Sequence, residues 1–572
     1  MELIAARRPA DAAAVREFTA AYLRRLAPDA AAEVSPEELY GEITGAFDFA
    51  AGRGDRPMAV RVFNPTRATE GYERDGTVVE TNTEDLPFLV DSVGAALDAA
   101  GLGVQRVMHP VVGIERAQDG RITAVLHPRD AATRESVMHF DLDRRLEGEA
   151  LEELAATIRH VLGDVRRAVL DFPAMSDKAR RMVQLASAGA ARYPDDEVDE
   201  TVAFLEWLLQ DHFIFLGYRD YRIAEDTISV VPGSGLGILA DEASSAFARP
   251  QPLASVPDGV RERALEGDLL IVSKTNRLSP VHRRVRMDYI GVRRVSAEGR
   301  IVGEARMLGL FTTKAYAQPA SQTPLLNRKL RQILRHEDLI EGSHDYKAAV
   351  SLFDSFPKDE LFSAPAKDLQ RAIVALLALE GDRVRLLGRR SHDGRSASLI
   401  AAMPASRYDP ELLESFRTLL RERFKTEAVD TTTVLGENDQ VRVHVSLHGL
   451  EGVPEVPVRE LEQKLIALTR TWDDGLREQL ARRLGTTAGR ELAGRWGPRF
   501  PRYYKASVEP SLAIADVLAF ERLERDEEPF VVDLQNEPER TRVALYKRGG
   551  KVELGEAMPI LEDLVLVALR EA

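Results

Sequence analysis

The feature that most constrains the fold is a change of hydrophobic period that recurs along the chain. Between residues 76 and 171, stretches of alternating, β-branched side chains are separated by segments with helical spacing. A period of two predicts strands, and a period near 3.6 predicts helices. The resulting order, strand, helix, two or three strands and a helix, is typical of a ferredoxin-like α+β unit with an antiparallel sheet and helices on one face.

The elements of this first unit follow from short stretches. "TVVETNTE" predicts a strand at 77–84, and residues 85–100 predict a helix with its apolar stripe on one side. The turn "AQDG" joins two of the later strands. The remaining predicted elements are strands at 103–116, 121–127 and 136–143 and a helix at 148–171.

A similar pattern returns between residues 383 and 485. Two strands precede a helix that starts with Asp409 as N-cap and Pro410 at the first position. A hairpin at 428–449 and a long amphipathic helix at 457–485 follow. Near the C-terminus, a strand at 541–550 and a helix at 553–564 predict the beginning of another such unit.

The middle of the chain predicts a different, mostly antiparallel α+β domain. Its predicted strands are at 212–223, 228–231 and 268–273, followed by a hairpin at 285–311 that turns at Ala297–Gly299. The stretch "HRRVRMDYIGVRR" at 282–294 is basic, but its alternation predicts one solvated hairpin face with Glu304 and Arg306 opposite, not a nucleic-acid site. Residues 173–210 and 320–380 predict helices, the latter broken near Pro357 and Pro365.

Composition predicts a soluble, cytoplasmic protein. The net charge of −15 argues against binding to nucleic acid or to an anionic membrane. The absence of cysteine excludes disulfides, thiolate nucleophiles and Cys-ligated metals. The N-terminus lacks the apolar segment of a secretory signal, and the longest apolar runs fall far short of the roughly 20 residues that span a bilayer.

The loop between the first strand and helix is the candidate site, with Asn82, Asp85, Pro87, Phe88 and Asp91. The two aspartates are six residues apart and point to different sides of a helix, so they cannot share a proton as a catalytic pair. We expect Asp85 or Glu84 in the first turn, where the positive end of the helix dipole stabilises a carboxylate. Backbone N–H groups at such a helix start also suit a carboxylate ligand, so the loop is either an effector site or an interface.

Other motifs carry weaker functional signals. "GSGLG" at 233–237 predicts a turn, because its flanks do not form the strand–turn–helix of a dinucleotide site. The "SHD" triplets at 343–345 and 391–393 predict caps or loops. His109 and His127, each before a proline, have no third metal ligand at suitable spacing. We therefore predict no catalytic, cofactor-binding or metal-ligating residue in this chain.

Several ordered blocks resemble one family. "VVETNTEDLPFLVDSVGAALDAAGLGVQRVMHPVV", "HFIFLGYRDYRI", "SPVHRRVRMDYIGVRRVSAEGRIVGEARMLGLFTTKAY" and "GSHDYKAAVSLFDSFPKDELF" resemble the large bacterial NAD-specific glutamate dehydrogenases over roughly residues 30–565. The resemblance is to their N-terminal region, which is made of ACT-like units with a PAS-like insertion. It implies that NAD binding and catalysis belong to a C-terminal part of the intact protein.

The resemblance also implies domains and partners. ACT domains often bind amino acids and typically carry a glycine after the loop proline, where this chain has Phe88. The implied partners are the protein's own catalytic region, further copies in a homo-oligomer and an amino-acid effector. The alternative is a free-standing amino-acid-sensing or scaffold module without oxidoreductase activity. The predicted domains are N-terminal helices 1–50, ACT-like domain 51–172, helical connector 173–194, PAS-like domain 195–317, helical segment 318–380, ACT-like domain 381–486, connector 487–530 and an incomplete ACT-like domain 531–572.

Overall fold

The computed structural model describes residues 1–24, 34–118, 120–224, 226–256, 261, 265–379, 381–391, 396–436, 439–450, 455–525, 529–536, 541–550, 555, 559 and 563. The chain divides into two compact units, Met1–Ala378 with Ser391–Arg395, and Leu379–Arg390 with Ser396–Ala572. Every strand pair in the described residues is antiparallel, and the predicted α+β class is confirmed.

The first sheet has strand order β1-β2-β6-β4-β5, with β3 beside β6. The predicted single strand at 103–116 is wrong, because it breaks at His109–Pro110 into two strands that pair with different halves of β6. Proline has no N–H to continue a ladder. The strands are β1 (Met58–Phe63), β2 (Val78–Glu84), β3 (Val104–Met108), β4 (Val111–Arg116), β5 (Ile122–Leu126) and β6 (Arg134–Leu142).

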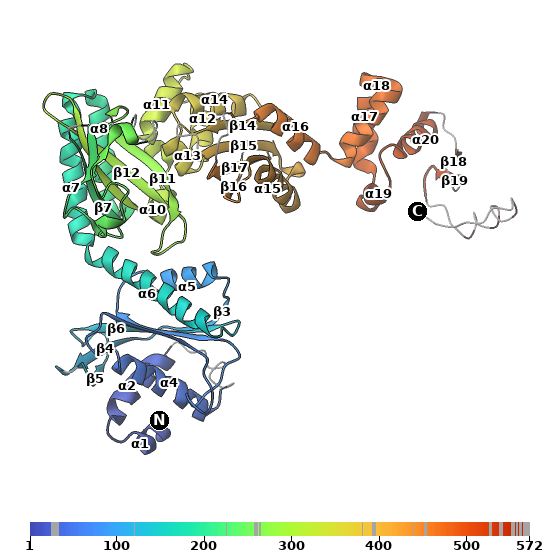
Figure 1. Ribbon diagram of the computed structural model, residues 1–572. Helices are drawn as coiled ribbons and strands as arrows, with labels where there is room; N and C mark the ends of the chain where they lie inside the picture. The colour runs from blue at the N-terminus through green and yellow to red at the C-terminus, as the bar shows by residue number, and fades with distance from the viewer. Residues whose placement is uncertain are drawn as a thin grey trace. The chain divides into compact units, whose positions relative to one another are not determined.

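Helices cover both faces of this sheet, so the expectation of helices on one face is wrong (Figure 1). The predicted pair, α5 (Leu89–Ala99) and α6 (Glu149–Leu170), packs on a face of apolar side chains that include Val79 and Phe140. The other face buries Ile114, Val125 and Val137. It is covered by α1 (Glu2–Arg7), α2 (Ala12–Leu23) and α4 (Pro36–Ala51).

The second sheet has strand order β10-β8-β7-β13-β12-β11, with β9 beside β7. The predicted hairpin is confirmed as β12 and β13, with the turn at Ala297–Gly299. Helix α7 (Phe172–Ala188) packs against β7 and β12, and α8 (Asp195–Trp207) packs against α7. The strands are β7 (Phe213–Ala224), β8 (Thr227–Val230), β9 (Leu236–Gly237), β10 (Gln251–Pro252), β11 (Leu270–Leu278), β12 (Arg286–Val295) and β13 (Ile301–Phe311).

The predicted solvated face of this hairpin is wrong at Asp288, which is buried. Its carboxylate is 2.8 Å from Nζ of Lys274 on the neighbouring strand β11. Glu304 and Arg306 bond to each other and to tyrosines rather than to the charges of the first hairpin strand. Asp288, Glu304 and Arg306 are therefore paired with groups of the second sheet itself.

One apolar core joins the first two sheets. It contains Val79 and Phe140 of the first sheet together with Leu216, Met287 and Leu310 of the second. The helices that follow break at Pro357 and Pro365, as predicted, because each proline precedes the first residue of a new helix. They are α10 (Thr313–Ala317), α11 (Leu326–His336), α12 (His344–Asp354), α13 (Lys358–Ser363) and α14 (Ala366–Leu377).

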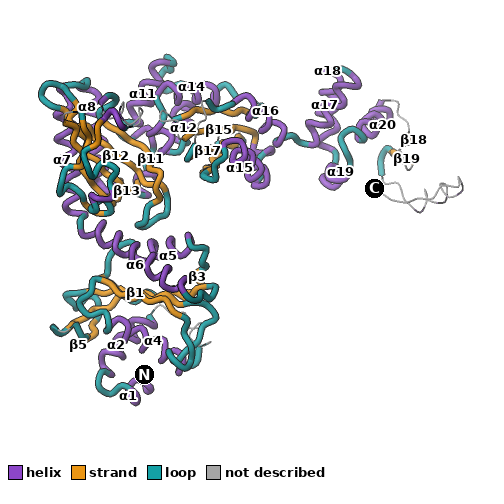
Figure 2. The backbone as a smooth tube through the Cα atoms, in the orientation of Figure 1, coloured by secondary structure: helices purple, strands orange, loops and turns teal. Residues whose placement is uncertain are grey.

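The second unit contains a four-stranded sheet of order β14-β15-β17-β16, with helices beside the strands (Figure 2). Its core is formed by the strands and by Phe416 of α15 and Leu461 of α16, among others. The strands are β14 (Arg385–Arg390), β15 (Ser396–Pro404), β16 (Val429–Leu435) and β17 (Gln440–His448), and the helices are α15 (Pro410–Phe424) and α16 (Val458–Leu468).

The predicted single helix at 457–485 is wrong. Helix α16 ends at Leu468, and α17 starts with a capping box in which Thr471 and Asp474 exchange hydrogen bonds. The predicted strand at 541–550 is confirmed as β19, whereas of the predicted helix at 553–564 the structure describes only residues 555, 559 and 563. The remaining elements are α17 (Trp472–Leu484), α18 (Thr486–Trp496), α19 (Arg502–Ser507), α20 (Ala513–Arg525), β18 (Phe530–Asn536) and β19 (Thr541–Lys547).

Candidate functional site

The candidate loop joins β2 to α5 and contains a later helix start than predicted. Asp85 does not lie in the first turn, because the helix begins at Leu89. The Asp85 N–H donates to the carbonyl of Arg134 at 2.9 Å, which continues the strand pairing. Pro87, which is exposed, disfavours a helical conformation at the residue before it. Asp91 is the acidic residue of the first turn.

Phe88 occupies the helix N-cap in a left-handed conformation, with φ of 72° and no side-chain cap. A residue with a Cβ pays about 1–2 kcal/mol for that conformation, whereas glycine adopts it freely. This φ gives a physical reason for the glycine that ACT domains typically carry here. In this chain the surrounding contacts must offset the cost of the phenylalanine.

Those contacts come from His282, in the segment before β12 of the second sheet. The Phe88 and His282 rings are 5.1 Å apart, and Phe88 also packs against the shared apolar core. The His282 N–H donates to Ser92 Oγ at 2.8 Å, and Ser92 Oγ donates to the Phe88 carbonyl at 2.6 Å. His282 Nδ1 is 2.9 Å from a carboxylate oxygen of Asp91. The loop is thus closed by a segment of its own chain.

His282 itself has a positive φ of 65°. Two non-glycine residues in left-handed conformations, Phe88 and His282, therefore meet across this contact. Such strain persists only where the surroundings over-determine the backbone, and it tends to concentrate at functional positions. The contact combines ring packing, a backbone hydrogen bond and a side-chain hydrogen bond between His282 and Asp91, which favours an interface over an open ligand site.

Asn82, the remaining predicted site residue, lies apart from this contact. It is fully buried in β2, where its amide accepts a hydrogen bond from Arg53 at 2.7 Å and donates to Glu135 at 3.1 Å. Arg116 also pairs with Glu135 at 2.8 Å. Burial alone would raise the pKa of Glu135, but the Arg116 and Arg53 guanidinium groups hold it below its ordinary value. Asn82 therefore belongs to a buried polar cluster under the N-terminal helices.

A second ionic cluster lies on the same sheet face, at its centre His139 of β6. His139 is fully buried between Glu80 at 2.9 Å and Asp141 at 3.0 Å. Burial would lower the pKa of His139, but the hydrogen bonds that its ring donates to Asp141 and Glu80 raise it to about 9. The imidazole is therefore an imidazolium at neutral pH.

Glu42 of α4 connects this ionic cluster to the N-terminal helices. Its carboxylate, which is fully buried, pairs with Arg74 at 2.5 Å and Arg106 at 2.7 Å and accepts a hydrogen bond from Tyr22 at 2.9 Å. Burial would raise the pKa of Glu42, but His139 and Arg106 lower it below its ordinary value. The charges compensate one another, so the cluster fixes the helices to the sheet.

The weaker motifs have structural roles in the described residues. "GSGLG" forms the predicted turn, and its Gly233 and Gly235 N–H groups donate to the carboxylate of Glu242. Ser343 caps α12 by accepting from Tyr346 N–H, as predicted for the first "SHD", while His392 and Asp393 of the second lie outside the described residues. Within the described ranges, no group of three His, Asp or Glu side chains is arranged to hold a metal.

Comparison with known proteins identifies the family. Models of four glutamate dehydrogenase segments match the chain: the ACT1 domain at 18–158, helical motif 1 at 323–382, the ACT2 domain at 385–473 and helical motif 2 at 479–523. Proteins named NAD-specific glutamate dehydrogenase are also similar, from Halomonas elongata (29% identical over 561 residues) and Pseudomonas aeruginosa (28% over 534 residues). The chain belongs to the large NAD-specific glutamate dehydrogenase family.

The matches cover most of this chain but only a part of each relative. The aligned regions are 94% of the chain and 34% of the Halomonas protein, and 90% and 32% for the Pseudomonas protein. A third relative with the same name, from Mycobacterium tuberculosis, is 24% identical over 87% of the chain and 30% of its own length. The chain thus spans about a third of the length of the curated relatives it matches.

The family matches also locate the closed loop. Phe88 and Asp91 lie in the ACT1 match, whereas His282 lies in the 159–322 region between the ACT1 and helical motif 1 matches. The structure therefore brings together two of the five predicted site residues, Phe88 and Asp91. Sequence reasoning missed His282 and Ser92, because nothing in the spacing of "SPVHRRV" indicates that it reaches the first domain.

Proposed function

We propose that this chain is the regulatory and assembly region of an NAD-specific glutamate dehydrogenase. The intact protein would convert L-glutamate, NAD and water to 2-oxoglutarate, ammonium and NADH. Catalysis and NAD binding would belong to a part of the protein outside this chain. Support comes from the family membership and from relatives about three times as long as the matched region.

The observation that carries the regulatory part of the proposal is the closed ACT1 loop. The His282 contact replaces an open ligand site with a connection between the ACT1 domain and the second sheet domain. A conformational change in the second domain would alter the packing around Phe88. Because coupling is reciprocal, a change at Phe88 would also affect the second domain. We propose that the loop serves as an interface, with Phe88 and Asp91 in direct contact with His282, Asp85 and Pro87 setting the course of the loop, and Asn82 fixing the preceding strand β2 through its buried hydrogen bonds.

The proposal also covers the protein's location, assembly and partners. We infer a cytoplasmic homo-oligomer whose ACT-like and helical domains contact its own catalytic region, with an amino acid as effector and neither nucleic acid nor membrane as partner. The PAS-like class of the second sheet domain is part of this proposal. Among the described residues, no helix has the length and apolar character needed to span a bilayer.

Two assays of NADH formation test this function. The 572-residue chain should form no NADH from L-glutamate and NAD, whereas the intact protein should form it. NADH formation by the isolated chain would contradict the assignment of catalysis to another part of the protein. In the intact protein, Phe88→Ala should change the response of activity to effectors, while the exposed-site control Glu298→Gln should not.

The alternative is a free-standing sensing or scaffold module. It predicts that no oxidoreductase activity accompanies this chain in any form. An intact protein that carries this region and lacks glutamate dehydrogenase activity would favour the alternative and overturn the proposal.

A further inference from the structure

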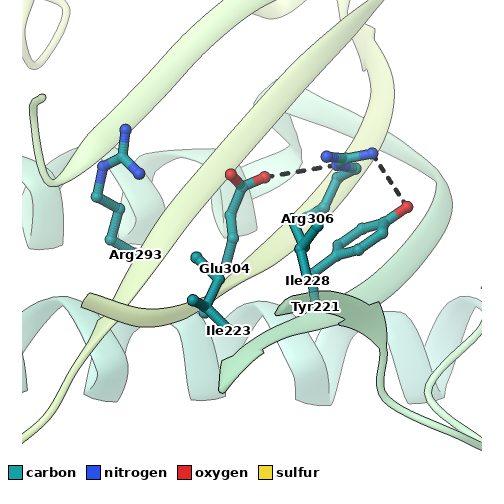
Figure 3. Close-up of a pocket in the computed structure, with 7 residues that line it drawn as sticks. Tyr221, Ile223, Ile228, Arg293, Glu304 and Arg306 are labelled. Atoms are coloured by element: carbon teal, nitrogen blue, oxygen red, sulfur yellow. Dashed lines mark hydrogen bonds and ion pairs between the residues drawn. The ribbon is translucent and has the colours of Figure 1, made fainter. Parts of the chain in front are cut away.

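The two faces of the second sheet differ in how their charges are balanced. On one face, Arg306 donates to Glu304 and to the Tyr221 hydroxyl, so one cation faces one carboxylate (Figure 3). Tyr289 of β12 belongs to this group, since its hydroxyl donates to Glu304. Asp288 is adjacent to Tyr289 on the strand, and because side chains alternate it points to the other face. On that face, one cation serves two carboxylates.

The shared cation is Lys274 of β11, which lies between Asp288 and Asp359 of α13. Its Nζ is 2.8 Å from Asp288 Oδ1 and 3.2 Å from Asp359 Oδ1. Asp288 is only 3% exposed, and its other oxygen accepts the Phe311 N–H at 3.2 Å. Among the described residues, neither carboxylate pairs with a further side-chain cation. This triad of Lys274, Asp288 and Asp359 therefore carries one excess negative charge when both carboxylates are ionised.

The other charged and titratable groups around the triad are engaged elsewhere or stay neutral. Arg283 donates to the Phe311 carbonyl at 2.7 Å. Lys358, which precedes Asp359 on α13, donates to the Tyr316 carbonyl at 2.9 Å. The Tyr316 hydroxyl donates to Asp359 Oδ1 at 3.3 Å, and burial raises its pKa, so it remains protonated. None of these groups supplies the missing positive charge.

Helix α13 is held on the second sheet by apolar packing as well as by the triad. The Phe362 ring stacks on Phe311 of β13, with ring centres 5.1 Å apart, and Leu361 is fully buried. The family match places α13 in helical motif 1, whereas β11, β12 and β13 lie before that match. The triad therefore joins helical motif 1 to the second sheet domain.

Asp288 is the member of the triad that changes charge near neutral pH. Burial raises its pKa to about 6; Lys274 opposes this rise, and the nearby Asp359 carboxylate adds to it. Burial would lower the pKa of Lys274, but Asp359 and Asp288 hold it above its ordinary value, so the lysine stays charged. A proton on Asp288 removes the like charge and leaves Lys274 to Asp359 alone.

We propose that Lys274, Asp288 and Asp359 form a pH-sensitive latch that holds α13 on the second sheet more tightly when Asp288 carries a proton. Detachment of α13 would take Asp359 away from Lys274 and admit water to Asp288, and both changes favour the ionised Asp288. Docking of α13 is therefore coupled to proton uptake. The gain in docking is present at low pH and is lost as the pH rises through about 6, the pKa of Asp288 in the docked state.

Hydrogen bonds connect this latch to the segment that closes the ACT1 loop. The Phe311 N–H donates to Asp288, and the Phe311 carbonyl accepts from Arg283. Arg283 follows His282, whose ring packs against Phe88. The inference rests on the proposed regulatory function only for its consequence, in which acidification would affect the ACT1 loop contact as well as helical motif 1.

Hydrogen exchange of the 572-residue chain, followed by mass spectrometry, tests the latch. Protection factors of the α13 amides report its opening and correct for the intrinsic pH dependence of exchange. We expect them to be higher at pH 5 than at pH 7.5 by up to about tenfold, the gain for a carboxyl whose pKa moves from about 4 to about 6. This comparison needs no variant. Equal protection of α13 at both pH values would overturn the proposal.

Matched variants identify the group that titrates. Asp288→Asn is neutral at every pH, so α13 should be as protected at pH 7.5 as at pH 5. Asp359→Asn leaves Lys274 to Asp288 alone, so most of the pH dependence should disappear. Glu298→Gln, in the exposed turn between β12 and β13, should retain the full pH dependence. Equal pH dependence in Asp288→Asn and Glu298→Gln would contradict the latch. No measurement here involves NADH formation, so failure is distinct from failure of the proposed function.

Discussion

The two ACT domains start the helix after a central strand in opposite ways. In the ACT1 domain the N-cap is Phe88, with φ of 72°, no side-chain cap and contacts from His282 of another domain. In the ACT2 domain, Asp409 is extended and its carboxylate accepts from Leu412 N–H at 2.7 Å. The first helix start therefore depends on a tertiary partner, whereas the second is stabilised within one turn.

The two ACT sheets also differ in how far they depend on specific polar partners. Strand β17 of the ACT2 sheet directs Val441, Val443 and Val445 into an apolar core. Strand β6 of the ACT1 sheet directs Phe140 into apolar packing on one face and His139 into the ionic cluster on the other. A buried ion pair requires a specific partner side chain in a specific geometry, whereas an apolar core tolerates substitution by other apolar side chains of similar volume. The ACT1 domain is therefore the one built for specific contacts with its neighbours.

The largest expected effect comes from breaking the ionic cluster. Glu42→Gln removes one of the two buried carboxylates, Glu42 and Asp141, that pair with the Arg74 and Arg106 guanidinium groups, which should cost about 3 kcal/mol of unfolding free energy. The matched control Glu38→Gln, on the same helix, affects only a pair with the exposed Arg67 and should cost less than about 1 kcal/mol. Thermal and urea unfolding measure both, and equal losses would show that the cluster contributes no more than a surface pair.

The pH dependence should be the next largest effect. The pKa of His139 is raised to about 9 in the folded chain from an ordinary value near 6.5. Its stabilisation is therefore fully present below about pH 6.5 and is lost as the pH rises through 9. We expect the melting temperature to fall between pH 7 and pH 9.5, and His139→Gln to show a smaller fall. An equal fall in the variant would contradict this role of His139.

The loop contact predicts a paired result at Phe88. Phe88→Ala removes packing with His282 and the shared core and should cost about 2 kcal/mol, since the ring is only partly buried. Phe88→Gly loses the same packing but adopts the positive φ without strain, so it should be more stable than the alanine variant by about 1 kcal/mol. Unfolding measurements that rank alanine above glycine would contradict the left-handed conformation.

The smallest expected effect is at the self-contained helix start. Asp409→Ala removes the side-chain cap and should cost about 1 kcal/mol, whereas Asp409→Asn retains an acceptor and should cost little. Neither change should affect the ACT1 domain. Hydrogen exchange of the first turn of α15 measures the local effect, and equal protection in both variants would show that the cap is dispensable.

The sequence predicted local features well and tertiary features poorly. The Asp409 cap and the helix breaks at Pro357 and Pro365 depend only on neighbouring residues, so the sequence predicts them. The helix start at Leu89 was not, because it depends on the pairing of Asp85 with Arg134 and on the left-handed conformation of Phe88. Residue types alone do not report either feature.

The candidate site shows the same division. The sequence predicts a loop between the first strand and helix, and the structure has such a loop between β2 and α5, with Phe88 in it. Its partner His282 is 194 positions further along the chain, and no local periodicity connects the two. The stretches "VVETNT" and "VMHFD" predict strands, but they do not show that Glu80 and His139 are internal, because these side chains are covered by N-terminal helices that include Tyr22 and Glu42.

The apolar core shared by the first two sheets also governs how the chain opens. Leu216 and Met287 pack with Val79 and Phe140, so separating the two sheets exposes both sides of one core. Segments that share a core tend to open as one cooperative unit. Amide protons of β2 and β7 should therefore exchange with solvent at a common rate, although the two strands belong to different sheets and lie more than 120 positions apart. A change that opens either sheet would therefore expose the shared core and open the other sheet as well.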